Sequence, residues 1–244
     1  MRPAERIICA LDVPSGDAAL RYVELLREHV GVFKVGLELL MAEGPGVVPR
    51  LHAAGAQKIF LDAKLHDIPN TVMGAVRGLA HLGVWAVTLH TFGGRNMLEA
   101  AHRAALEAAQ EAQREPPFLF GVTVLTSISP TVLKQELRVT EPMEELVVHL
   151  ARLAFQSGCG GVVASPQELI ALRTAFPEPG HLFITPGVRP AQNVADDQAR
   201  TLTPAEAIRR GASYLVIGRP ILTAQNPVEA AQRIAEEIQS ALEE

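Results

Sequence analysis

The sequence predicts a (β/α)8 TIM barrel, a closed barrel of the α/β class, formed as a single domain by residues 1–244. Short apolar runs rich in β-branched residues alternate with longer stretches of helical spacing, and this alternation occurs eight times. Eight strand–helix units in 244 residues fit a closed barrel better than an open doubly wound sheet. No Gly-x-Gly-x-x-Gly motif follows the first strand, which disfavours a dinucleotide-binding fold.

The predicted strands are the short apolar runs, whose composition suits a parallel sheet buried on both faces. They begin near Ile7, Val32, Lys58, Trp85, Phe118, Gly160, Leu182 and Ser213. The clearest helical stretches cover residues 16–30, 93–115, 141–158 and 227–244. Two longer connections, residues 126–142 and 189–201, follow the fifth and seventh strands. Because barrels place functional residues in the loops after their strands, we expect both connections to contribute to a site.

The composition limits the class of protein. Hydrophobic residues make up 48% of the chain and charged residues 20%, which allows a sizeable core and disfavours disorder. The net charge is -5 and the basic residues form no block, which argues against nucleic acid as the main partner. No apolar stretch reaches about 18 residues, and we expect a cytoplasmic protein with no membrane partner. Cys9 and Cys159 show no metal or disulfide spacing and are expected to be reduced and structural.

The basic residues comprise 18 Arg and only four Lys. Arginine stays charged under ordinary conditions, whereas lysine can serve as a proton donor in catalysis. One explanation for the bias is genomic base composition, with the remaining lysines left at random. However, Lys34 and Lys64 both fall at predicted strand ends, which favours a functional reason for keeping them.

The carboxyl ends of the predicted strands, where barrel enzymes build their active sites, carry many polar residues. In chain order these ends carry Asp12, Lys34, Asp62 with Lys64, His90, Thr126, Ser165, Pro186 to Arg189, and Gly218 with Arg219.

Asp62 and Lys64 lie two positions apart in the segment LDAKLHDIPNT, residues 61–71. A strand directs both side chains to the same side, here the barrel mouth, with their charges in contact or nearly so. One interpretation is a structural ion pair, because a buried charge without its partner is costly. Asp12 and Lys34 add a second such pair at the same level, which favours a functional array.

Asp67, in the stretch DIPNTV, directly precedes a predicted helix. Taken alone, its position is best explained as a helix N-cap, with Asn70 in the third helical position.

A glycine and an arginine, Gly218 and Arg219, follow the eighth strand in the stretch VIGRPI. Barrels often bind phosphate at this place through backbone N–H groups and the start of a short helix. Arg189, after the seventh strand, can supply a second positive charge to the same anion. The two arginines together predict a phosphorylated substrate.

Metal and nucleophilic chemistry have little support in the sequence. The eight histidines show no His-x-His or HExxH spacing, and the candidate carboxylates each have a lysine nearby, so no metal site is predicted. There is no Gly-x-Ser-x-Gly motif, and neither cysteine has an evident histidine partner. A Schiff base at Lys34 or Lys64 remains open.

These residues resemble those of the orotidine 5'-monophosphate decarboxylase family. The segment LDAKLHDIPNT is similar to the family's D-x-K-x-x-D-I signature, and the similarity extends over the whole chain through Asp12, Lys34, VLTS, TPGVR, DDQ and IGRPI. The resemblance implies decarboxylation of orotidine 5'-monophosphate to uridine 5'-monophosphate and CO2, the final step of UMP biosynthesis. It further implies that no cofactor or metal is used, and that a homodimer shares two active sites across its interface.

The same resemblance implies the catalytic residues. Lys64 would stabilise the carbanion and protonate carbon 6 of the pyrimidine. Lys34, Asp62 and Asp67 of the partner subunit would complete an alternating charge array around it.

Substrate contacts are implied in the same way. The ribose would be bound by Asp12 and Lys34, the pyrimidine by Thr126, and both base and phosphate by Gln198 from a closing loop. Ile68 and Thr71 would cross the interface with Asp67. The remaining substrate-binding positions are Pro186, Arg189, Gly218 and Arg219, of which the last three would hold the phosphate.

Two alternatives remain open from the sequence. A related Mg²⁺-dependent sugar-phosphate enzyme, such as a keto-gulonate phosphate decarboxylase or a hexulose phosphate synthase, shares the aspartate-x-lysine pair. A non-catalytic nucleotide-binding regulator would keep the barrel and the phosphate loop. Chelator resistance tests the first alternative, and turnover of orotidine monophosphate tests the second.

Overall fold

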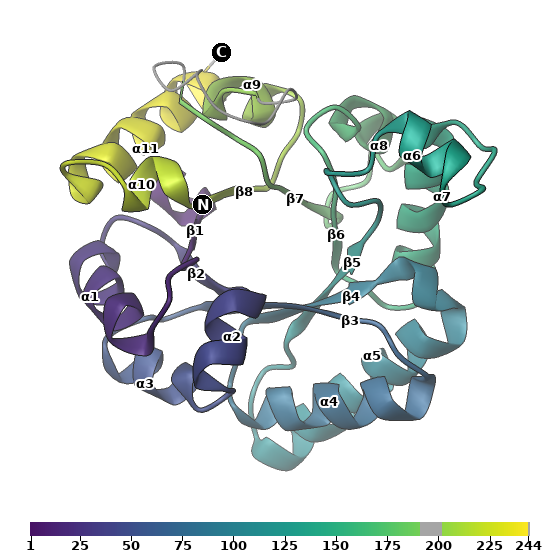
Figure 1. Ribbon diagram of the computed structural model, residues 1–244, viewed down its shortest axis with the longest axis horizontal. Helices are drawn as coiled ribbons and strands as arrows, with labels where there is room; N and C mark the ends of the chain where they lie inside the picture. Colours follow the sequence, from purple (N-terminus) through teal and green to yellow (C-terminus); the bar gives the residue numbers. More distant parts are fainter. Residues whose placement is uncertain (191–201, 244) are drawn as a thin grey trace.

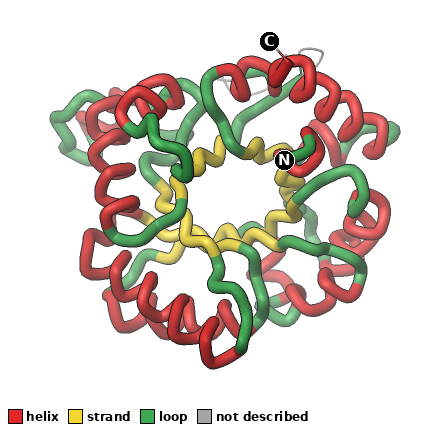
Figure 2. The backbone as a smooth tube through the Cα atoms, turned by 180° about the vertical axis from the view of Figure 1, so that it is seen from behind, coloured by secondary structure: helices red, strands yellow, loops and turns green. Residues whose placement is uncertain are grey.

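The computed structural model describes residues 1–190 and 202–243 and forms a closed barrel of eight parallel strands. The strands follow one another around the barrel in chain order, and β8 closes it by pairing with β1. Helices form an outer ring around the strands (Figures 1 and 2). This (β/α)8 architecture confirms the fold class that the sequence predicts.

Each strand begins within one residue of its predicted start, because the first apolar residue of a buried strand is well marked in the sequence. The strands are β1 (Ile7–Ala10), β2 (Val32–Val35), β3 (Ile59–Leu65), β4 (Ala86–His90), β5 (Phe118–Val122), β6 (Gly161–Val163), β7 (Leu182–Thr185) and β8 (Tyr214–Ile217).

Four helices, α1, α5, α7 and α11, lie within the helical stretches predicted from the sequence. None of the helices in the described part of the chain is long and apolar enough to cross a membrane. The helices are η1 (Pro3–Arg6), α1 (Gly16–Leu26), α2 (Leu37–Glu43), α3 (Val47–Ala53), α4 (Pro69–His81), η2 (Thr91–Gly93), α5 (Gly94–Ala112), α6 (Pro130–Gln135), α7 (Met143–Gln156), α8 (Leu169–Ala175), α9 (Pro204–Arg209), α10 (Arg219–Leu222) and α11 (Pro227–Glu243).

The long connection after β5 contains a short helix, α6, that the periodicity did not reveal. Ser129 caps it, since its Oγ accepts a hydrogen bond from the Val132 backbone N–H at 3.2 Å, and Pro130 occupies the first turn. Serine followed by proline is a common helix start. The sequence therefore held a local signal for α6, although the helix is too short to show an apolar period.

The barrel interior is filled by side chains at alternate strand positions. One packed layer comprises Ile8, Val32, Phe60, Ala86, Phe120, Ile184 and Tyr214. The rings of Phe60 and Phe120 meet edge to face, with centroids 5.7 Å apart. Because strand side chains repeat with a period of two, the next inward residues lie one step nearer the carboxyl ends of the strands. On β2 and β3 these residues are Lys34 and Asp62, so the apolar layer lies directly beneath the charged groups.

Both cysteines are buried free thiols. Burial raises the pKa of Cys9 and of Cys159 to about 12, so both stay protonated near neutral pH. A buried, protonated thiol is a poor nucleophile, which agrees with the structural role expected from the sequence.

Candidate active site

A cavity of about 290 Å³ opens at the carboxyl ends of the strands. Its base is apolar and includes Phe60 from the packed interior layer. Polar and charged side chains stand above this base, on β2, β3 and the segments that follow the strands. Nine residues proposed from the sequence line the cavity, namely Asp12, Lys34, Asp62, Lys64, Thr126, Pro186, Arg189, Gly218 and Arg219.

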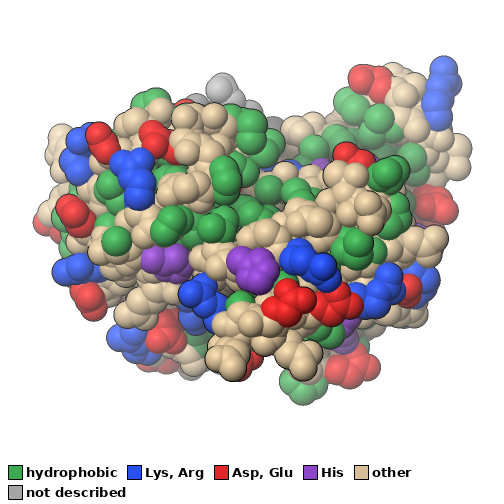
Figure 3. Space-filling view, turned by 90° about the horizontal axis from the view of Figure 1, so that it is seen from below, with side chains coloured by type: hydrophobic (Ala, Val, Ile, Leu, Met, Phe, Trp, Pro, Cys, Tyr) green, Lys and Arg blue, Asp and Glu red, His purple; other side chains and the backbone are tan. Residues whose placement is uncertain are grey.

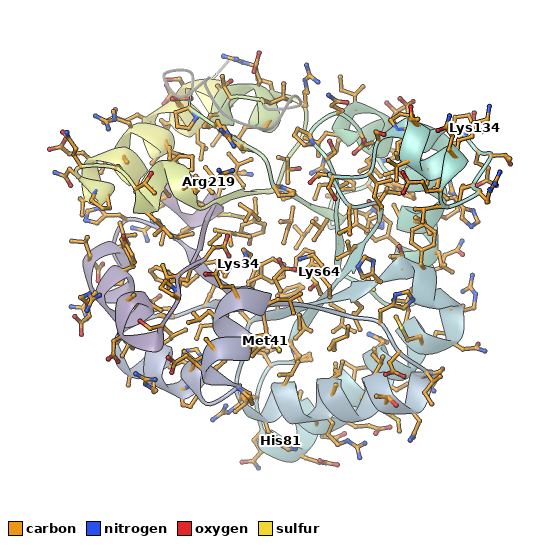
Figure 4. All side chains as sticks on the ribbon, in the orientation of Figure 1. Lys34, Met41, Lys64, His81, Lys134 and Arg219 are labelled. Carbon is orange, nitrogen blue, oxygen red and sulfur yellow. The ribbon has the colours of Figure 1, made fainter. Side chains whose placement is uncertain are left out.

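Four of these residues form a chain of alternating charges along one wall. Lys34 Nζ lies 3.0 Å from Asp12 Oδ1 and 3.7 Å from Asp62 Oδ2. Lys64 Nζ lies 2.8 Å from the same Asp62 oxygen. The Asp62 carboxylate thus forms ion pairs with two ammonium groups. The ion pairs run without a break from Asp12 through Lys34 and Asp62 to Lys64. In Figure 4 Lys34 and Lys64 lie beside each other at the centre of the barrel.

Burial increases toward the middle of this charge array. The exposed fraction of the side chain is 9% for Lys34 and 15% for Asp62, against 30% for Lys64 and 51% for Asp12. Opposite unit charges about 4 Å apart attract by about 4 kcal/mol at an effective dielectric of 20, and desolvation offsets part of that gain. The buried pair in the middle is therefore held rigidly, while the Lys64 ammonium remains accessible from the cavity.

The backbone of β3 is irregular where it carries Asp62 and Lys64. Leu61 pairs with Val87 and Leu65 pairs with Leu89, so the residues between them on β3 lie opposite Thr88 alone. Lys64 adopts a left-handed conformation, with φ at 48°. A regular strand was expected to direct both charges into the barrel mouth. Both do line the cavity, but they reach it through a bulge.

Arginine and glycine residues line another part of the cavity. Arg189 follows β7, and Gly218 with Arg219 follows β8 at the start of α10. In Figure 4 Arg219 lies at α10, across the barrel opening from Lys64. A Cβ on Gly218 would lie 3.3 Å from the Ala10 Cβ and 3.6 Å from Asp12 Oδ2, so glycine keeps this wall open.

Asp67, Ile68 and Thr71 do not line this cavity. All three are exposed, and Ile68 is 67% exposed. The N-cap interpretation of Asp67 is wrong: the N-cap of α4 is Ile68, and no side chain caps the helix. The Asp67 carboxylate instead accepts a hydrogen bond from the adjacent Ile68 N–H at 2.6 Å. Gln198 lies outside the described residues.

His90 and Ser165, noted at strand ends, do not line the cavity either. Burial, together with electrostatic interaction with His66 and Lys64, lowers the pKa of His90, so its ring is neutral near pH 7. Ser165 is buried, and its Oγ accepts a hydrogen bond from the Gln167 N–H at 3.4 Å. Among the described residues, no group of three or more His, Cys, Asp or Glu is arranged to hold a metal ion.

Comparison with known proteins identifies the family. The model of the orotidine 5'-phosphate decarboxylase / HUMPS family matches residues 5–234. This chain belongs to that family. It is 48% identical to the orotidine 5'-phosphate decarboxylase of Moorella thermoacetica, over 98% of this chain and 94% of the relative. It is 47% identical to the enzyme of the same name from Syntrophotalea carbinolica, over 98% and 97% of the two chains.

A solved structure supports the same assignment to the family. The crystal structure of orotidine 5'-phosphate decarboxylase from Lactobacillus acidophilus superposes with a TM-score of 0.83 at 38% identity, covering 95% of this chain and 98% of that chain. The family resemblance stated from the sequence is thereby confirmed.

Sequence reasoning missed two residues that shape the site. Thr88 is fully buried on β4 and hydrogen-bonds both Asp62 and the Lys64 backbone. Gly36 lies against the charge array, since a Cβ there would be 2.8 Å from Lys34 Nζ and 3.2 Å from Asp12 Oδ1. The signal for Thr88 was its position two residues before His90, a spacing that directs both side chains inward.

Replacing Gly36 with alanine tests the packing of the charge array. The backbone at Gly36 (φ -91°, ψ -178°) accepts alanine, so the fold should survive while the added methyl displaces the Lys34 and Asp12 side chains. We expect Gly36→Ala to lower kcat/KM for orotidine 5'-phosphate, the compound in the relatives' names, by about 10- to 100-fold. Steady-state kinetics and thermal melting measure the two effects.

Gly46→Ala is the matched control, because a Cβ on Gly46 meets no atom within 4 Å. It should leave kcat/KM unchanged. Wild-type kinetics in Gly36→Ala would contradict the tight packing of the array.

Proposed function

We propose that this chain catalyses the cofactor-independent decarboxylation of orotidine 5'-monophosphate to uridine 5'-monophosphate and CO2, in pyrimidine biosynthesis. The observation that carries the proposal is the continuous charge array from Asp12 to Lys64, at a cavity that two arginines also line. The curated relatives with 47–48% identity are named for this activity, which supports the same chemistry here.

The cavity lining suggests how the nucleotide lies. Arg189, Gly218 and Arg219 hold the phosphate, and Pro186 borders the same loop. The charge array lies on β1, β2 and β3 and their carboxyl ends, where Asp12 and Lys34 bind the ribose hydroxyls. Thr126, after β5, contacts the edge of the pyrimidine. This placement brings carbon 6 of the base toward Lys64.

Lys64 stabilises the negative charge that develops at carbon 6. Loss of CO2 leaves an electron pair there that no carbonyl or imine delocalises well, so the protein must supply the stabilisation that a cofactor would otherwise give. A fixed ammonium beside that carbon favours the carbanion over the more diffuse carboxylate. The same ammonium then donates the proton that completes the product, and the Lys64 side chain, 30% exposed, is accessible for this transfer.

Asp62 holds the Lys64 ammonium in place. Its Oδ2 lies 2.8 Å from Lys64 Nζ, and Lys34 on the other side limits its movement. Rigidity matters because charges that reorient during the reaction add to its barrier. Repulsion between Asp62 and the substrate carboxylate is a second, smaller contribution that raises the energy of the ground state.

We also propose that the site is completed by a second copy of the chain. Asp67, Ile68 and Thr71 are exposed and lie outside the cavity of their own barrel. Large apolar side chains are exposed on α2, with Leu37 at 49% and Met41 at 74%, and just before α4, with Ile68 at 67%. Exposed apolar side chains favour association where they form a contiguous patch. In the side view of Figure 3, hydrophobic side chains gather mainly in the upper half of the surface.

In such a dimer Asp67 of the partner subunit reaches the Lys64 ammonium and extends the alternating array. Ile68 and Thr71 cross the interface with it. Two carboxylates, Asp62 and Asp67 of the partner subunit, then flank the proton donor.

A direct assay tests the proposed function against its two rivals. We expect the purified protein to convert orotidine monophosphate to uridine monophosphate, followed by absorbance, with the same rate before and after treatment with a chelator. Loss of activity that returns with Mg²⁺ would indicate the metal-dependent sugar-phosphate enzyme. Binding of uridine monophosphate without any turnover would indicate a nucleotide-binding regulator.

Lys64→Ala tests the proposed proton donor. The substitution removes the ammonium from a partly exposed position at the cavity, so the barrel should remain folded and should still bind uridine monophosphate, measured by calorimetry. Turnover of orotidine monophosphate should fall by at least about 10⁴-fold, because both carbanion stabilisation and proton transfer are lost. Substantial residual decarboxylation would refute the assignment of Lys64.

Subunit mixing tests the shared site. Lys64→Ala and Asp67→Ala are each expected to be inactive, but a hybrid dimer contains one site in which Lys64 and Asp67 of the partner subunit are both intact. Mixing the two variants should therefore restore activity, measured after subunit exchange has been verified.

The matched control mixes Lys64→Ala with Asp62→Ala. These two residues belong to the same barrel, so no hybrid site is complete and no activity should return. Equal behaviour of the two mixtures would show that Asp67 acts within its own chain.

A further inference from the structure

Thr88, in the middle of β4, is fully buried beside the charge array, with 0% of the residue exposed. Its side-chain oxygen contacts both charged residues of β3. The hydroxyl donates to Asp62 Oδ1 at 3.0 Å and accepts from the Lys64 backbone N–H at 2.8 Å. One oxygen thus joins the side chain of one array member to the backbone of the other.

The irregular pairing of β3 and β4 explains why a side chain, and not the backbone of β4, accepts the hydrogen bond from the Lys64 N–H. Leu61 pairs with Val87 and Leu65 with Leu89, so Asp62, Ala63 and Lys64 lie opposite Thr88 alone. A backbone group within such a bulge lacks its regular ladder partner, and a buried N–H without an acceptor is costly. The Thr88 hydroxyl accepts the Lys64 N–H in place of a β4 carbonyl.

The conformation of Lys64 needs this support. Its φ of 48° is in the left-handed region, which an L-residue with a side chain enters only at an energetic cost. Such conformations persist where surrounding contacts fix them, and they gather at functional sites. In this protein the left-handed residue is the one that carries the proposed proton donor, and its Nζ returns to within 2.8 Å of Asp62 Oδ2.

The contact requires a group that both accepts and donates a hydrogen bond. A backbone N–H only donates and an ionised carboxylate only accepts, so the group between them must accept one hydrogen bond and donate another. A hydroxyl does both. Asp62 is then held at both oxygens, by Thr88 at Oδ1 and by Lys64 at Oδ2.

We propose that Thr88 is a positioning residue for the decarboxylation. Its hydroxyl fixes the Asp62 carboxylate and the bulged Lys64 backbone in one geometry, so that the Lys64 ammonium is aimed before substrate binds. Thr88 does not line the cavity and acts only through its two partners. This inference rests on the proposed role of Lys64.

Three substitutions separate the hydroxyl from the packing of the side chain. Thr88→Ser keeps the hydroxyl and removes the methyl. Thr88→Val keeps the shape and removes the hydroxyl. Thr88→Ala removes both the hydroxyl and the methyl group. It replaces Thr88→Val in the comparison if the valine variant fails to fold.

Steady-state kinetics with orotidine monophosphate, together with calorimetric binding of uridine monophosphate, should separate catalysis from binding. We expect Thr88→Val to lower kcat by about 10²-fold while KM and product affinity change by less than about threefold. A misaligned Lys64 slows the chemical step, but the contacts that bind the ground state remain. Thr88→Ala should lower kcat by at least about tenfold, and Thr88→Ser should stay within about threefold of wild type.

Thr91→Val is the matched control for the loss of a buried hydroxyl. Thr91 is also 0% exposed, but its Oγ1 donates to the Val122 carbonyl at 2.7 Å and not to a member of the charge array. This variant should lower the melting temperature without lowering kcat. A loss of kcat equal to that of Thr88→Val would mean that removing any buried hydroxyl at this end of the barrel lowers kcat, and it would overturn a specific role for Thr88.

Two further results would overturn the inference. Wild-type kcat in a folded variant without the hydroxyl would show that Thr88 positions nothing. A fall in kcat in Thr88→Ser as deep as in Thr88→Ala would assign the effect to the methyl group.

Lys64→Ala, assayed in the same way, distinguishes a failure of the proposed role of Lys64 from a failure of the proposed role of Thr88. If Lys64→Ala keeps its activity, the proposed function of Lys64 fails; if it is inactive while Thr88→Ala is normal, only the role of Thr88 fails.

Discussion

The Asp62 carboxylate is the group on which the proposed active site depends. Its Oδ2 lies between two ammonium groups, 2.8 Å from Lys64 Nζ and 3.7 Å from Lys34 Nζ. Its Oδ1 accepts a hydrogen bond from the Thr88 hydroxyl at 3.0 Å. A carboxylate buried to this degree is stable only if both oxygens have partners. Lys34 on β2, Thr88 on β4 and Lys64 in the bulge of β3 together supply these partners.

The barrel supplies the rigid support for this group. Aromatic and branched side chains fill the interior directly beneath it, with Phe60 and Phe120 in edge-to-face contact. A packed apolar layer excludes water from below and strengthens the charge interactions above it. At the same time the parallel strands end at one level, so residues far apart in the chain line a single cavity. In the proposed reaction, binding energy at the arginines then contributes to chemistry at Lys64 that leaves the phosphate unchanged.

Much of this arrangement could be predicted from the sequence, for identifiable reasons. Buried parallel strands are continuous apolar runs, so all eight strand starts are within one residue of their predicted positions. The side-chain period of two predicted Asp62 and Lys64 in one cavity, which they do line, although through the bulge of β3. The rule that barrel sites lie at strand ends predicted Arg189 and Arg219 there as well. These predictions depend only on local pattern and general topology.

The remaining features depend on the pairing of particular strands. Residue spacing does not reveal that the bulge of β3 lies opposite Thr88, because an extra residue in a ladder has no separate sequence signal when it is not glycine. Gly36 was missed because its importance lies in the side chains that come close to it. The N-cap interpretation of Asp67 failed because Pro69 places the helix start one residue later than the pattern suggested.

In the proposed mechanism the array holds the Lys64 ammonium beside carbon 6 of the bound pyrimidine. A crystal structure of the protein with uridine monophosphate tests it most directly. The account predicts Lys64 Nζ within about 3–3.5 Å of carbon 6, the near-attack range, with its contact to Asp62 retained and the phosphate at Arg189 and Arg219. A nucleotide bound with carbon 6 directed away from Lys64, while the array is intact, would contradict the account.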